Sequence, residues 1–137
     1  MNVYVDSSWL LRILLRQSSV RPLPADTKIY SSALLFVECR RTLERHLKQK
    51  RISSEFYQSE LDALQNFLEA IQIVELDKHI VRRAAEPFLL PIGTLDALHL
   101  ATALALSHSE ENPIHFATFD SELALAASAH GFSMIRE

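Results

Sequence analysis

Short strand-like segments alternate with longer helix-like segments along the whole chain. The first segment, 2–5, is β-branched and aromatic, and the next carries apolar residues at helical spacing. Because parallel strands need a helical crossover between them, this alternation favours an α/β fold, with a parallel sheet covered by helices on both faces. We expect strands at 2–5, 29–31, 73–76, 114–118 and 133–136. We expect a first helix that starts at residue 7 or 8, and further helices at 33–50, 54–70, 78–87, 95–107 and 121–130.

Polar residues mark most of the expected helix starts. Ser7 or Ser8 can cap the first helix, and Ser32, Asp77 and Thr94 stand at the starts of later ones. Such side chains accept hydrogen bonds from the unpaired N–H groups of the first helical turn. We therefore expect the connections between strands and helices at these positions.

The length of 137 residues predicts a single domain over 1–137. Apolar residues make up 48% of the chain, which excludes a disordered protein, and the single cysteine, Cys39, excludes an internal disulfide. The longest apolar stretch, 9–15, is broken by Arg12 and is too short to cross a bilayer. With no signal peptide before the first strand, we expect a cytoplasmic protein that does not contact a membrane.

Charge is distributed unevenly along the sequence. Residues 1–51 carry a formal charge of +6 and residues 52–137 carry −9. A chain of this kind can offer a basic surface to a polyanion, although halves of a sequence need not be halves of the fold. Gly93 and Gly131 are the only glycines, which excludes a glycine-rich phosphate-binding loop.

Two aspartates follow expected strands directly. Asp6 comes after 2–5, and Asp120 comes just after 114–118. In an open parallel sheet, ligands bind outside the carboxyl ends of the strands, near the point where the strand order reverses. Helix capping is an alternative explanation for each aspartate taken alone.

Two further carboxylates lie in apolar helical surroundings. Glu38 follows a run of apolar residues, and Asp96 lies in the first turn of an apolar helix. Glu38 has the alternative of a salt bridge to Arg41 or Arg45, and Asp96 that of a favourable interaction with the helix N-terminus. Because buried carboxylates repel one another, a cluster of them needs a cation. Ligation by oxygen alone selects Mg²⁺ or Mn²⁺, which in such a setting points to phosphoryl chemistry on nucleic acid.

Four sequence pieces, in order, resemble a PIN-domain ribonuclease of the VapC toxin type, and the resemblance covers essentially the whole chain. The pieces are Val3-Tyr4-Val5-Asp6-Ser7-Ser8, Tyr30-Ser31-Ser32-Ala33-Leu34-Leu35-Phe36-Val37-Glu38, Leu95-Asp96-Ala97-Leu98-His99-Leu100-Ala101-Thr102-Ala103, and Thr118-Phe119-Asp120-Ser121-Glu122-Leu123 with Ala126, Ala127 and Gly131.

The resemblance implies a five-stranded sheet in the order 3-2-1-4-5, with Asp6 and Asp120 side by side. It also implies a Mg²⁺-dependent endoribonuclease, with Mn²⁺ as a substitute, that cuts single-stranded or looped RNA. A cognate antitoxin would neutralise this enzyme, and the toxin would pair as a homodimer. By residue-to-residue match, the catalytic and metal-binding carboxylates are Asp6, Glu38, Asp96 and Asp120.

Other residues have a functional and a structural explanation of similar weight. Ser7 and Thr118 could bind a phosphate or orient a carboxylate, and Glu122 could be an outer ligand; their alternatives are a helix cap, a strand position and the helix dipole. For His99, we expect a packed histidine bonded to backbone, rather than a general acid or a metal ligand. The candidate RNA-binding residues are basic, with a solvated helix face as the alternative: Arg40, Arg41, Arg45 and Lys48.

Rival functions depend on residues that this chain lacks. A phosphatase with an aspartyl nucleophile needs Asp-x-Asp after the first strand, whereas here the run is Asp6-Ser7-Ser8. A response-regulator receiver needs an Asp at the end of the third strand and a Lys after the fifth, and Asp77 and Arg136 are poor substitutes. The remaining alternative is a PIN-like module that binds RNA or protein without catalysis.

Overall fold

The computed structural model describes residues 1–15 and 22–135, and it contains a five-stranded parallel sheet. The observed order is β3-β2-β1-β4-β5, which confirms the expected α/β fold and topology. Arg136, placed in the expected fifth strand, lies outside the described residues. The strands are β1 (Asn2–Val5), β2 (Lys28–Ser32), β3 (Gln72–Val74), β4 (Ile114–Ala117) and β5 (Ser133–Met134).

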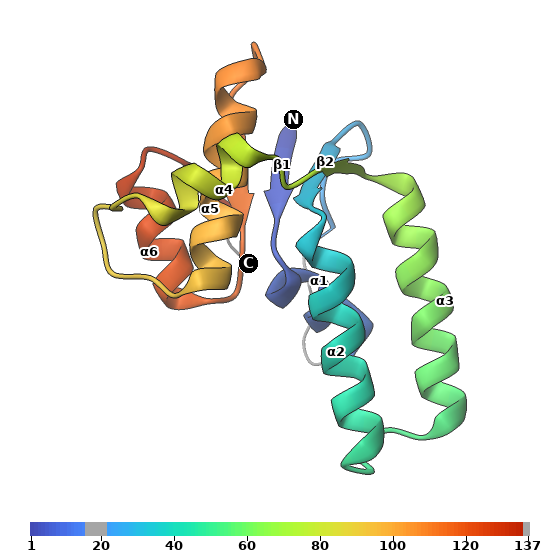
Figure 1. Cartoon of the computed structure of the whole chain (residues 1–137). Helices are drawn as coiled ribbons and strands as arrows, with labels where there is room; N and C mark the ends of the chain where they lie inside the picture. Colours follow the sequence, from blue (N-terminus) through green and yellow to red (C-terminus); the bar gives the residue numbers. More distant parts are fainter. Residues whose placement is uncertain (16–21, 136–137) are drawn as a thin grey trace.

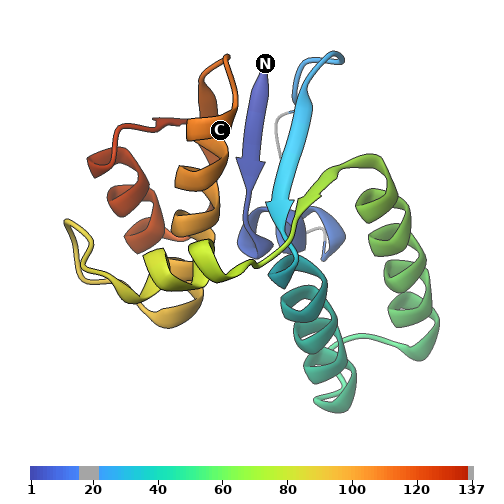
Figure 2. The ribbon, with the colours of Figure 1, turned by 45° about the horizontal axis from the view of Figure 1, so that its top comes forward.

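Helices cover both faces of the sheet (Figures 1 and 2). One layer holds α1 (Ser7–Leu14), α2 (Leu34–Lys48) and α3 (Ser54–Ala70). The other layer holds α4 (Lys78–Ala85), α5 (Thr94–Ser109) and α6 (Ser121–Ala129). The α2–α3 hairpin extends well beyond the end of the sheet (Figure 1).

Two hydrophobic cores lie on opposite faces of the sheet and share β1 as a wall. Val3 and Val5 pack into the core beneath α1, α2 and α3, whereas Tyr4 packs into the core beneath α5 and α6. Successive residues of a strand point to opposite faces, so the apolar run of β1 is buried on both sides. This burial explains why no residue of β1 is exposed.

Strand pairing brings the ends of β1 and β4 together. Val5 pairs with Ala117, and the backbone N–H of Asp6 bonds to the carbonyl of Ala117 at 3.3 Å. β2 lies on the other side of β1, so the strand order reverses at β1. Residues that follow β1 and β4 therefore meet at one edge of the sheet, which we call the carboxyl edge.

Three expected helix caps are wrong, because each helix begins one or two residues away from the expected position. Asp6, rather than Ser7 or Ser8, caps α1 by accepting from the N–H of Trp9. Gly93 precedes α5, so Thr94 is already helical. Ser32 accepts from the N–H of Leu34, although Ala33 is the residue directly before α2.

The third strand also differs from its expected range. β3 covers Gln72–Val74, where 73–76 was expected, because the chain turns away at a bond from the N–H of Asp77 to the carbonyl of Glu75. Asp77 caps α4 as predicted. Within 1–15 and 22–135, we find no helix whose length and hydropathy would let it span a bilayer.

Candidate active site

Asp6 is the most enclosed carboxylate of the carboxyl edge, with 4% of its surface exposed. Its Oδ1 accepts from the backbone N–H of Trp9 at 3.1 Å, and its Oδ2 accepts from the hydroxyl of Thr118 at 2.6 Å. The hydroxyl of Ser8 lies 2.8 and 3.0 Å from the two oxygens. Burial raises the pKa of Asp6, while the bond from Thr118 opposes the rise.

Thr118 joins Asp6 to Asp120. Its Oγ1 donates to Asp6 and accepts from the backbone N–H of Asp120 at 3.0 Å. Asp120 in turn caps α6, where its Oδ1 accepts from the N–H groups of Glu122 and Leu123 at 2.9 and 3.1 Å. The capping explanation for Asp6 and Asp120 is thus observed in both cases, and it coexists with their meeting at one edge.

Glu38 contacts a histidine from the opposite layer. Its Oε1 lies 2.5 Å from Nε2 of His99, and Nδ1 of His99 lies 2.7 Å from the hydroxyl of Tyr4. The expectation that His99 bonds to backbone is therefore wrong: its ring bonds to two side chains. The alternative of a Glu38–Arg41 salt bridge is wrong as well, because Arg41 pairs with Glu44.

The charges of the other three carboxylates affect the pKa of Asp96. Burial, followed by the charges of Asp120 and Asp6, raises the pKa of Asp96 to about 6, and the charge of Glu38 adds to this effect. Each of these three carboxylates is therefore close enough to Asp96 to act on its charge. Asp6 and Asp120 follow the strand ends of β1 and β4, Asp96 lies in the first turn of α5, and Glu38 lies in the second turn of α2.

The four carboxylates are neighbours without forming a closed ligand set. In the described part of the chain, no three acidic, histidine or cysteine side chains approach closely enough to enclose a metal ion. Their chemistry nevertheless fits a hard divalent cation, because all donors are carboxylate oxygens and their mutual repulsion is of the kind that a cation relieves.

Only some of the other candidate residues contact the four carboxylates. Thr118 bonds to Asp6 directly, whereas Glu122 is exposed in the first turn of α6. Ser8, rather than the predicted Ser7, supplies the second hydroxyl at Asp6. Two adjacent serines carried no signal to separate them, since only the helical turn after Asp6 decides which one points back.

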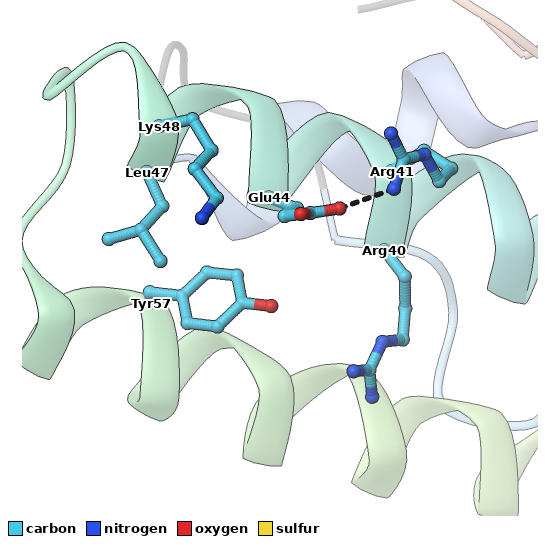
Figure 3. A pocket seen from close by; sticks show the side chains of 6 residues that line it. All are labelled: Arg40, Arg41, Glu44, Leu47, Lys48 and Tyr57. Atoms are coloured by element: carbon cyan, nitrogen blue, oxygen red, sulfur yellow. Dashed lines mark hydrogen bonds and ion pairs between the residues drawn. The ribbon is translucent and has the colours of Figure 1, made fainter.

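A groove between α2 and α3 carries part of the predicted basic set. Its volume is about 470 Å³, and Figure 3 shows Lys48 and Tyr57 facing each other across it. The guanidinium of Arg40 also lies 5.6 Å from the ring of Phe36. Arg45 is exposed on the same helix. The groove, which we call the hairpin groove, is lined by Arg40, Arg41, Glu44, Leu47, Lys48 and Tyr57.

A family model for the PIN domain matches residues 3–128. The chain belongs to the PIN-domain family. Members of this family are typically nucleases that use divalent metal ions. The match spans all four carboxylates at the carboxyl edge, from Asp6 to Asp120.

Solved structures share this PIN fold over nearly the whole chain. VapBC2 from Rickettsia felis, bound to a DNA fragment from its promoter, gives a TM-score of 0.65 at 16% identity, covering 98% of both chains. VapBC-1 from nontypeable Haemophilus influenzae gives 0.58 at 13%, covering 98% and 97%. A toxin–antitoxin complex from Klebsiella pneumoniae gives 0.54 at 17%, covering 89% and 90%. Among curated protein sequences, none matches this chain.

Proposed function

We propose that this PIN domain is a Mg²⁺-dependent endoribonuclease toxin of the VapC type, held silent by a cognate antitoxin. The observation that carries the proposal is the meeting of Asp6 and Asp120 at the carboxyl edge through Thr118, beside Asp96, whose pKa their charges raise. Four carboxylates from four separate elements have little structural reason to meet there. Perturbed carboxyl groups of this kind gather at functional sites.

The residues that would hold the cation are Asp6, Glu38, Asp96 and Asp120. Bound there, Mg²⁺ or Mn²⁺ supplies Lewis acidity for hydrolysis of a phosphodiester bond. Thr118 and Ser8 keep the carboxylate of Asp6 in one orientation by bonding to both of its oxygens. Thr118 also fixes Asp120 through the backbone N–H of that residue.

The hairpin groove gives the RNA strand a path away from the cut. Lys48 lies ten residues after Glu38 on α2, a separation of about 15 Å along the helix axis. Arg40, Arg41, Arg45 and Lys48 supply positive charge for phosphates, and Tyr57 offers an aromatic face for a base. RNA binding by these residues fits the positive charge of 1–51.

The test of activity is cleavage of an end-labelled RNA by the purified chain, with and without EDTA. Asp96→Asn keeps the shape of the side chain and should abolish cleavage. Asp62→Asn removes the same charge from the exposed face of α3 and should leave cleavage unchanged. RNA binding with no metal-dependent cleavage by the wild type would favour the non-catalytic PIN-like module instead.

An antitoxin partner is the second part of the proposal, and its support is the VapBC complexes of the same fold. An Arg or Lys of the partner placed against the four carboxylates would supply the countercharge that the cation otherwise provides. The gene next to this one should encode a short protein with a basic residue near its C-terminal end. A co-purified complex should be inactive, and a complex that cut RNA at the free enzyme's rate would contradict the proposal.

The remaining features follow from the same proposal: a single domain over 1–137, a homodimer, and action in the cytoplasm on cellular RNA. Sedimentation of the purified chain tests the homodimer. A monomer at micromolar concentration would contradict it without touching the cleavage assay.

A further inference from the structure

A line of three hydrogen-bonded side chains connects the core beneath α5 and α6 to the carboxyl edge. Tyr4 has no exposed surface, His99 has 2% and the side chain of Glu38 has 17%. The Tyr4 hydroxyl lies 2.7 Å from Nδ1 of His99, and Nε2 lies 2.5 Å from Oε1 of Glu38. Only the last member reaches the edge, so the other two act on the site through it.

The proton positions along this line follow from donor and acceptor chemistry. A carboxylate only accepts, so Nε2 of His99 carries the proton shared with Glu38. In the neutral imidazole, Nδ1 is then an acceptor, and the Tyr4 hydroxyl donates to it. Tyr4 and Glu38 therefore favour the same tautomer of neutral His99, the one that donates to Glu38.

We infer that His99 is a positioning residue for Glu38, and that Tyr4 fixes the tautomer that lets it act. His99 occupies Oε1 and leaves Oε2 as the oxygen offered to the cation. This inference rests on the proposed function, because it assigns Glu38 to the metal. Hydrogen-bonded partners behind a metal ligand commonly change metal affinity 10–100-fold when they are removed.

Packing keeps the histidine ring in place. The rings of His99 and Tyr4 meet edge to face, with centroids 5.9 Å apart at 72°, and Tyr4 packs against Phe116 at 5.1 Å. Glu38 has a long side chain on the partly exposed face of α2, where Phe36 and Val37 are exposed. A bond to a fixed ring from the opposite layer removes the rotational freedom that Glu38 would otherwise have.

The first test needs no variant. Nitrogen-15 NMR of the imidazole side chains at neutral pH, with EDTA present, reports the tautomer of each histidine. We expect His99 to show a proton on Nε2 alone. Tyr4→Phe keeps the ring and removes one of the two bonds that favour this tautomer, so a minor fraction of His99 with its proton on Nδ1 should become detectable. A proton on Nδ1 of His99 in the wild type, alone or together with one on Nε2, would overturn the inference.

The second test measures Mn²⁺ affinity from the signal of free Mn²⁺ in electron paramagnetic resonance. His99→Leu preserves an apolar fill and removes the donor, so it should weaken binding about 10–100-fold. His99→Gln keeps an N–H donor close to the place of Nε2, and it should recover most of the affinity. Wild-type affinity in His99→Leu, or equal losses in both variants while both remain folded, would overturn the inference.

Glu38→Gln separates this inference from the proposed function. If Glu38→Gln and Asp96→Asn bind Mn²⁺ as the wild type does, the proposed ligand set is wrong. If those two variants lose Mn²⁺ while His99→Leu retains it, the ligand set stands and only the role of His99 is wrong.

Discussion

Asp96 carries its charge at a cost that depends on pH. Its pKa in the folded protein is about 6, against an ordinary value of 3.8. Because the folded pKa is the higher one, ionised Asp96 destabilises the native state fully above about pH 6, and this penalty fades as the pH falls from 6 towards 4. We predict that Asp96→Asn stabilises the metal-free protein at pH 7.5 and that its advantage shrinks by pH 5. Urea unfolding in EDTA at several pH values measures this difference in unfolding free energy. A difference between the variant and the wild type that stayed constant with pH would contradict the prediction.

The hydroxyl of Thr118 bonds at once to the carboxylate of Asp6 and to the backbone N–H of Asp120. Thr118→Val keeps the volume but removes the bond to Asp6 and the acceptor for the N–H of Asp120. We predict a loss of about 1.5–3 kcal/mol in unfolding free energy at pH 7, the usual range for a hydrogen bond to a charged group. Thr118→Ser retains the hydroxyl and should lose much less. Equal losses in the two variants would assign the effect to the methyl group instead.

At the scale of elements, the proposed function gives the α2–α3 hairpin the role of binding the RNA strand. Each Lys that neutralises a phosphate of a single strand contributes about 0.7 to the slope of log affinity against log salt. In the uncleaving Asp96→Asn background, Lys48→Gln should lower this slope by about that amount, measured by fluorescence anisotropy of a labelled RNA. Lys78→Gln, on α4 in the other layer, is the matched control and should leave the slope unchanged. An unchanged slope in Lys48→Gln would exclude Lys48 from the RNA path.

The order of elements was predictable because each strand and helix has its own local pattern. The strand at 2–5 and the cap at Asp77 depend on neighbours in sequence, and both predictions are confirmed. The contacts that shape the candidate site are not local. Thr118 meets Asp6 across 112 positions, and His99 meets Glu38 across 61. The four carboxylates and Thr118 could be named as candidates from the sequence alone. The hydrogen bond between His99 and Glu38 could not be predicted from it.

The whole molecule should respond to metal as one cooperative unit. Mg²⁺ that binds only the native state raises the free energy of unfolding by linkage. We predict a rise in melting temperature with millimolar Mg²⁺, reversed by EDTA and reduced in Asp120→Asn. Asp62→Asn should keep the full rise. No shift for the wild type at millimolar Mg²⁺ would mean that the four carboxylates do not act on one cation.

The bond between Glu38 and His99 joins α2 to α5, which pack on opposite faces of the sheet. A ribosome releases the chain from its N-terminus, so α1, α2 and α3 emerge long before α5 and β4. Until Asp120 has been added and β4 has inserted beside β1, Asp120 is absent from the carboxyl edge. A growing chain, or one cut short by premature termination, therefore holds an incomplete set of carboxylates. The carboxyl edge is complete only after β4 and Asp120 have been made and folded against β1.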